Sequence, residues 1–237
     1  MAEDSTADRL PGGSTPLAML AATSAGWFFV QTGRYLLPPL APSITAAFDI
    51  GNDEFGIAIT MLWAVYAVTN FPAGLASDDL GFKTVLVGSL LVGGVGFTGL
   101  ALVRSYAGLL GLLAVVGVAT GFLLIGCRTY LSALYGDRRG RALGVHTASG
   151  DVGGVVAPIV ATAAVGLAAW WSPFLALAVA VLAVAAYLHV ATDGDYAVRR
   201  PEILAPSRAA LADIASLQVG GLIALYGVYV LVSPGEP

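Results

Sequence analysis

Long apolar segments alternate with short polar ones along most of this chain. Six apolar stretches have about the 20 residues that a helix needs to cross a bilayer, and they cover residues 17–40, 54–75, 84–103, 106–133, 141–166 and 169–191. A polar segment and a seventh apolar stretch follow. The pattern predicts an all-α membrane protein with four parts: a disordered tail (1–16), a six-helix unit (17–191), a linker (192–207) and a seventh, truncated helix (208–237).

The composition is typical of an integral membrane protein. Apolar residues make up 57% of the sequence and charged residues 11%, whereas soluble domains carry about 25% charge. The 30 glycines suit helices that pack closely inside a membrane. Cys127 is the single cysteine, which excludes a disulfide or a cysteine-based metal site within one chain.

Basic residues lie mainly on one side of the predicted helices. They fall in the N-terminal tail and in the loops after the second, fourth and sixth helices, whereas the opposite loops hold only Arg104. Lys and Arg are enriched in cytoplasmic loops. We therefore expect a multi-pass protein of the cell membrane with a cytoplasmic N-terminus.

The loop between the second and third apolar stretches carries the most specific motif. It contains Gly74, Asp78, Gly81 and Lys83. The glycines would let backbones approach closely, and Asp78 could cap a helix. The spacing resembles the Gly-x-x-x-Asp-Arg-x-Gly-x-Arg/Lys loop of major facilitator superfamily transporters, with Asp79 in the place of the Arg.

This resemblance implies the N-terminal half of such a transporter. Each half has six transmembrane helices, arranged as two inverted three-helix repeats. The seventh apolar stretch would begin the second half. We expect the 237-residue chain to be a fragment, truncated or frameshifted, whose missing C-terminal half is supplied in cis or in trans.

Arg34 lies inside the first apolar stretch, where a charge costs about 2.5 to 3.5 kcal/mol on insertion scales. It must face protein or water, or else reach the outer interface. The spacing of Arg34, Leu37 and Pro42 resembles the first helix of the organic anion (anion:cation symporter) branch of the superfamily. In that branch the Arg binds an anionic substrate, a role that suits the bidentate fork of a guanidinium.

Four residues are predicted to bind substrate. Trp27 and Gln31 follow helical spacing with Arg34 and share its face, and Asn70 lies on the second helix. The predicted set is Arg34, Gln31, Trp27 and Asn70.

The fifth predicted helix carries two candidates for coupling, Asp151 and His146. Asp151 is about ten residues from the cytoplasmic end, near mid-membrane at 1.5 Å per residue, and it could bind a proton, a cation or Arg34. His146 could titrate near neutral pH or serve only in packing. Arg128, at the cytoplasmic end of the fourth helix, is expected to pair with Asp78 as a structural contact.

These features predict a secondary active transporter, or half of one, that moves a small organic anion or metabolite by alternating access. A drug or metabolite exporter of the same superfamily is one alternative, and a non-transporting membrane scaffold or inert fragment is another. We do not expect an enzyme, because the chain lacks a His-Glu-x-x-His metal motif and a phosphate-binding loop. The expected partners are the lipid bilayer, the substrate and H⁺ or Na⁺ as coupling ion; we expect no cofactor, metal or nucleic acid.

Overall fold

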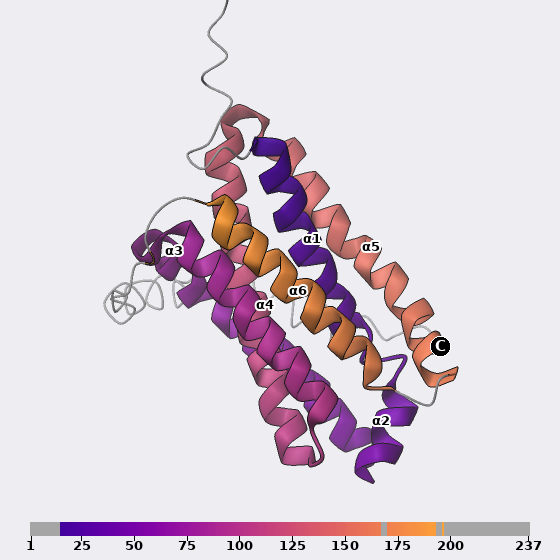
Figure 1. Ribbon diagram of the computed structural model, residues 1–237. Coiled ribbons are helices and arrows are strands. Elements are labelled where there is room, and N and C mark those ends of the chain that lie inside the picture. Colours follow the sequence, from indigo (N-terminus) through magenta and orange to yellow (C-terminus); the bar gives the residue numbers. More distant parts are fainter. Residues whose placement is uncertain (1–14, 167–169, 193–195, 197–237) are drawn as a thin grey trace, which may run out of the picture. The chain divides into compact units, whose positions relative to one another are not determined.

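The computed structural model describes residues 15–166, 170–192 and 196, without the side chains of residues 75, 78 and 79. The chain divides into two units after Arg199, and all the described residues belong to the first. The predicted tail, most of the linker and the seventh helix lie outside the described residues. The elements are α1 (Pro16–Tyr35), α2 (Ala41–Phe48), α3 (Asn52–Leu102), α4 (Tyr106–Tyr135), η2 (Gly136–Arg138), α5 (Arg139–Gly166) and α6 (Ser172–Ala191) (Figure 1).

The first helix is shorter than predicted. It begins at Pro16, where the Thr15 side chain accepts a hydrogen bond from the Ala18 backbone N–H at 3.2 Å. It ends at Tyr35 rather than at residue 40, because Pro38 and Pro39 lack backbone N–H groups and disfavour helix before them. A turn then leads into the short helix α2, which the apolar pattern did not predict.

The second and third predicted helices form one element, α3, that reverses direction at Gly81. Gly81 adopts φ 74° and ψ 158°, a conformation open mainly to glycine. The polar loop is therefore tighter than predicted. A Cβ at Gly74 or Gly81 would meet no atom within 4 Å, so the close backbone approach expected at these two glycines is wrong, and Gly81 serves the turn instead.

Four helical stretches of the described residues are long and apolar enough to cross a membrane. They are Asn52–Gly74, Leu80–Leu102, Tyr106–Gly166, which comprises α4 and α5, and Ser172–Ala191. Helix α1 has membrane length but is not among them, because polar residues such as Thr23, Ser24 and Gln31 lower its mean hydropathy.

The helices pack along their lengths in pairs. Helix α3 lies against α4 and α6, and α1 lies against α5 and α6 (Figure 1). Phe97 of α3 and Phe174 of α6 are fully buried, with ring centroids 6.3 Å apart. Burial of these large side chains places the apolar core between α1, α3, α4 and α6.

Glycines on α4 and α5 bring backbones together. A Cβ at Gly117 would lie 2.8 Å from the Leu62 carbonyl oxygen, and one at Gly121 would lie 3.1 Å from that of Tyr66. On α5, a Cβ at Gly153 would lie 2.7 Å from the Phe28 carbonyl oxygen of α1. These contacts fix where the first span of α3 and the middle of α1 can sit.

A valine at Gly121 should therefore destabilise the unit by about 1 to 3 kcal/mol, the usual cost of overpacking. Gly111, on the same helix, has nothing within 4 Å of its Cβ position, so Gly111→Val controls for helix propensity. Thermal unfolding of the two purified variants in detergent measures the difference. Equal melting temperatures would show that the α3–α4 contact tolerates a side chain.

Candidate substrate-binding site

Arg34, in the last turn of α1, is the buried charge around which the candidate site is arranged. Its side chain is 4% exposed. The Nη1 group donates a hydrogen bond to Gln31 Oε1 at 2.6 Å. On the other side, Cζ lies 4.0 Å from the Trp63 ring centroid and 4.3 Å from that of Tyr66. One hydrogen bond from α1 and two cation–π contacts from α3 thus hold the guanidinium inside the unit.

Within the described residues, the buried Nε and Nη2 groups of Arg34 make no hydrogen bond of standard geometry, although the Tyr66 side chain lies close enough to interact with the guanidinium. These two nitrogens share one edge of the planar guanidinium, and such an edge binds a carboxylate through two parallel N–H···O bonds. Buried charged donors without partners are costly, so this edge is suited to an anion.

Asp151 does not supply that anion. It lies on an exposed part of α5 and forms no ion pair with Arg34, so the resting pair expected between them is wrong for this structure. The reason is helical phase. Gly150 and Gly153 face α1 in close contact, and at about 100° per residue Asp151 points away from that contact.

His146 is fully buried beside α1. Its ring stacks on Trp27 with centroids 5.6 Å apart. Among the residues that the structure describes, neither ring nitrogen has a hydrogen-bond partner, and neither does the buried hydroxyl of Ser24. The Ser149 hydroxyl lies 3.0 Å from the Ser24 carbonyl oxygen and 2.6 Å from that of His146, which fixes this part of α5 against α1.

The second predicted helix contributes more than sequence reasoning assigned to it. Trp63, Tyr66 and Asn70 follow helical spacing on the first span of α3. Asn70 is half-buried, and its Oδ1 has no hydrogen-bond partner in the part of the chain that the structure describes. Only Asn70 was predicted to bind substrate. Trp63 and Tyr66 could have been found because they share its helical spacing and because an intramembrane Arg needs aromatic or polar neighbours.

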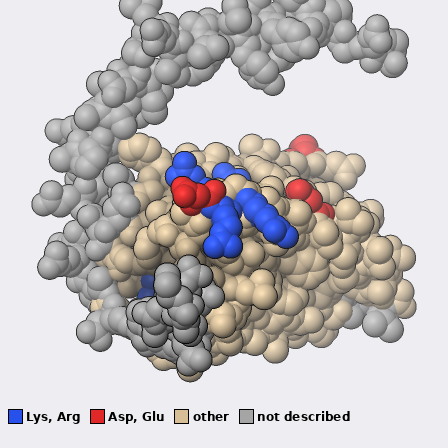
Figure 2. Space-filling view, turned by 90° about the horizontal axis from the view of Figure 1, so that it is seen from above, with Lys and Arg blue, Asp and Glu red and all other residues tan. Residues whose placement is uncertain are grey.

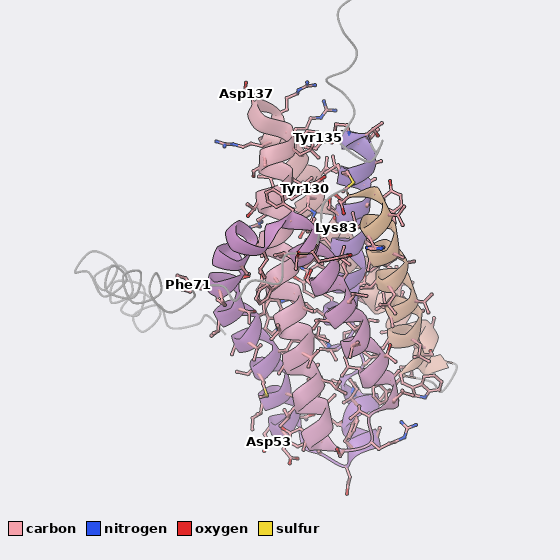
Figure 3. All side chains as sticks on the ribbon, turned by 60° about the vertical axis from the view of Figure 1, so that its left-hand side comes forward. Asp53, Phe71, Lys83, Tyr130, Tyr135 and Asp137 are labelled. Carbon is pink, nitrogen blue, oxygen red and sulfur yellow. The ribbon has the colours of Figure 1, made fainter. Side chains whose placement is uncertain are left out.

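The loop motif connects α3 with the end of α6. Lys83 Nζ donates to the Thr192 carbonyl oxygen at 2.8 Å and lies 5.2 Å from the Tyr196 ring centroid. Figure 3 shows Lys83 toward the same end of the unit as Tyr135 and Asp137, with Asp53 at the opposite end. The Asp78 side chain lies outside the described ones, so its pairing with Arg128 stays a prediction.

Comparison with known proteins identifies the family. Residues 23–233 match the model of the Major Facilitator Superfamily, so the chain belongs to this family of transporters. The expected fold, an all-helical half of such a protein, is thereby confirmed. No curated protein matches the sequence.

Two solved transporters have a similar fold. One is a bacterial homologue of the human lysosomal transporter Spinster, in an inward-facing and occupied conformation, with a TM-score of 0.66 at 17% identity. The match covers 80% of this chain and 46% of the homologue. A mutant of the peptide transporter POT, in complex with sulfate, gives a TM-score of 0.60 at 17% identity. This match covers 92% of this chain and 47% of the transporter. The chain spans about half the length of these transporters.

Replacing Gln31 tests how Arg34 is held. Gln31→Leu removes the acceptor of the Nη1 hydrogen bond, so we expect it to cost about 1.5 to 3 kcal/mol, the value of a hydrogen bond to a charged group. Gln31→Glu restores an acceptor and should recover the melting temperature in detergent. If Gln31→Leu has the same melting temperature as the wild type, the hydrogen bond does not stabilise the unit.

Proposed function

We propose that this chain forms part of a secondary active transporter that moves a small organic anion by alternating access, with Arg34 as the anion-binding residue. The observation that carries the proposal is the buried Nε–Nη2 edge, which no described carboxylate neutralises. In surroundings of low polarity an anion on this edge gains two charge-assisted hydrogen bonds. A lysine at the same place would offer no fork.

The neighbours of Arg34 have separate roles in this proposal. Gln31 orients the guanidinium through Nη1, which leaves the opposite edge free for the substrate. Trp63 and Tyr66 stabilise the cation by facing it with their rings. Asn70 and Trp27 complete the binding surface on α3 and α1.

Coupling to H⁺ or Na⁺, as in the anion:cation symporter branch, belongs to the same proposal. Asp151 is the candidate for the coupling ion, because it is a carboxylate on an exposed part of a membrane helix. A second six-helix unit, in cis or in trans, would complete the transporter. The uncompensated cation at Arg34 argues against an exporter of cationic drugs.

The orientation in the cell membrane is part of the proposal. Asp137, Arg138, Arg139 and Arg141 are exposed where α4 meets α5. Figure 2 looks onto one end of the unit and shows basic and acidic side chains gathered there. Three arginines in one short connection favour the cytoplasmic side, which would also be the side of the N-terminus.

The test of the anion site is binding and uptake by Arg34 variants. With a panel of radiolabelled mono- and dicarboxylates, Arg34→Lys should bind roughly ten- to a hundredfold more weakly, since it loses the fork but keeps the charge. Arg34→Gln should abolish binding to the purified chain and uptake into proteoliposomes. Arg104→Gln, in an exposed loop, is the matched control. Unchanged carboxylate binding in well-expressed Arg34→Gln would refute the anion site.

The orientation is tested with single cysteines at Asp53 and Arg139 in a Cys127→Ala background. These positions lie at opposite ends of the membrane helices, so a membrane-impermeant thiol reagent should label Asp53→Cys from outside the cell and Arg139→Cys only after permeabilisation. Labelling of both from one side would contradict the topology.

A further inference from the structure

The loop motif makes contacts that the proposed function does not use. Two consecutive residues after the Gly81 turn contact two different helices. Phe82 packs edge-to-face on Tyr130 of α4, with ring centroids 5.4 Å apart. Lys83 reaches the end of α6, where its Nζ donates a hydrogen bond to the Thr192 carbonyl oxygen at 2.8 Å. The turn is therefore a junction between α4 and the chain that leaves α6.

Thr192 is a favourable contact for a cation. It is the C-cap residue of α6, and carbonyl groups at the end of a helix carry partial negative charge and lack intrahelical partners. The ammonium of Lys83 satisfies one of these acceptors. The hydrogen bond joins residues that are 109 positions apart in the chain, so it ties the loop motif to a distant segment.

Tyr196 adds a second contact, beyond the end of α6. Its ring centroid lies 5.2 Å from Lys83 Nζ, within the range of a cation–π interaction. The ring also stacks on that of His189, with centroids 5.7 Å apart, and the Tyr196 hydroxyl lies 2.5 Å from His189 Nδ1. Tyr196 is thus held from two helices, by Lys83 of α3 and by His189 of α6.

Lys83 is the only lysine of the chain, which otherwise carries ten arginines. Its side chain is half-buried, although lysines are mostly exposed. A lysine ammonium is compact and sits on a flexible stem, so it can donate to a carbonyl oxygen while its charge lies near a ring. These two contacts compensate the ammonium for the water that it loses.

We propose that Lys83 is a tether, which holds the chain leaving α6 to the Gly81 turn through Thr192 and Tyr196. The predicted linker (192–207) would otherwise extend from the end of α6. Because an extended chain spans at most about 3.6 Å per residue, holding residues 192 to 196 shortens the reach of the linker by roughly 15 Å. The tether thereby limits how far a following unit can move from this one.

Proteolysis after Tyr196 tests the tether in the full chain in detergent. Chymotrypsin cleaves after aromatic residues in segments that open locally, so the cleavage rate reports how often the segment is released. Lys83→Met keeps a long stem but loses the charge and the donors, and it should raise this rate roughly three- to tenfold. Lys83→Arg keeps a cation with donors and should stay near the wild type. Arg104→Met, which removes a cation from an exposed loop, is the control.

Acetylation of Lys83 is a reciprocal measurement, because no other lysine competes for the reagent. Brief treatment with an amine-acetylating reagent, normalised to an added lysine peptide and read by mass spectrometry, measures how freely Lys83 is reached. Tyr196→Leu removes the ring and should raise the acetylation rate about threefold or more, whereas Tyr196→Phe keeps the ring and should raise it less. Tyr187→Leu, at another exposed tyrosine of α6, should match the wild type.

Either measurement can overturn the tether. Cleavage of Lys83→Met after Tyr196 at the wild-type rate, or an equal acceleration in Arg104→Met, would refute it. Unchanged acetylation of Lys83 in Tyr196→Leu would refute it as well, and this measurement decides if Lys83→Met fails to fold, as judged by size-exclusion chromatography. The anion site is tested separately, since none of these variants changes Arg34 or its contacts.

Discussion

The burial of one positive charge governs how α1 can pack in this protein. A guanidinium in a membrane helix is tolerated only where protein groups replace water around it. Arg34 meets this requirement with a hydrogen bond from its own helix and two aromatic faces from α3. The rotation of α1 that turns Arg34 toward Trp63 and Tyr66 also sets which of its side chains meet α5.

Close backbone contacts make that arrangement possible. Trp63 and Tyr66 reach Arg34 only if the first span of α3 lies tight against α4, where Gly117 and Gly121 leave no side chain between the helices. Gly153 does the same between α5 and α1. In lipid there is little hydrophobic drive for helices to associate, so small residues at such contacts supply van der Waals packing instead.

The sequence predicts the long helices well, because apolar length is a strong signal in a membrane protein. The predicted spans 106–133 and 141–166 correspond to α4 (Tyr106–Tyr135) and α5 (Arg139–Gly166). The end of α1 was misplaced because apolar residues continue past Tyr35 while two prolines end the helix. The length of an apolar stretch does not reveal such a break, whereas the two prolines in the sequence do.

The candidate site was harder to predict than the helices. The cost of an intramembrane charge pointed directly to Arg34, and helical spacing added Gln31. The pairing of Asp151 with Arg34 was wrong because depth in the membrane does not give rotation about the helix axis. That rotation depends on which glycines of α5 meet α1, and the sequence alone does not show which of several glycines in a Gly-rich helix make the contact.

In the proposed function, the position of Trp63 limits how an anion can reach Arg34. The ring covers the guanidinium at 4.0 Å yet is itself 42% exposed, so it stands between the buried charge and the surface of the unit. The span that carries it, Asn52–Gly74, is 11% buried, against 39% to 61% for the other membrane-length stretches. The backbone of the same span is nevertheless fixed against α4 by its close contacts with Gly117 and Gly121. In the proposed function, movement of the Trp63 side chain is therefore the least costly route to Arg34, because the helix backbones keep their contacts.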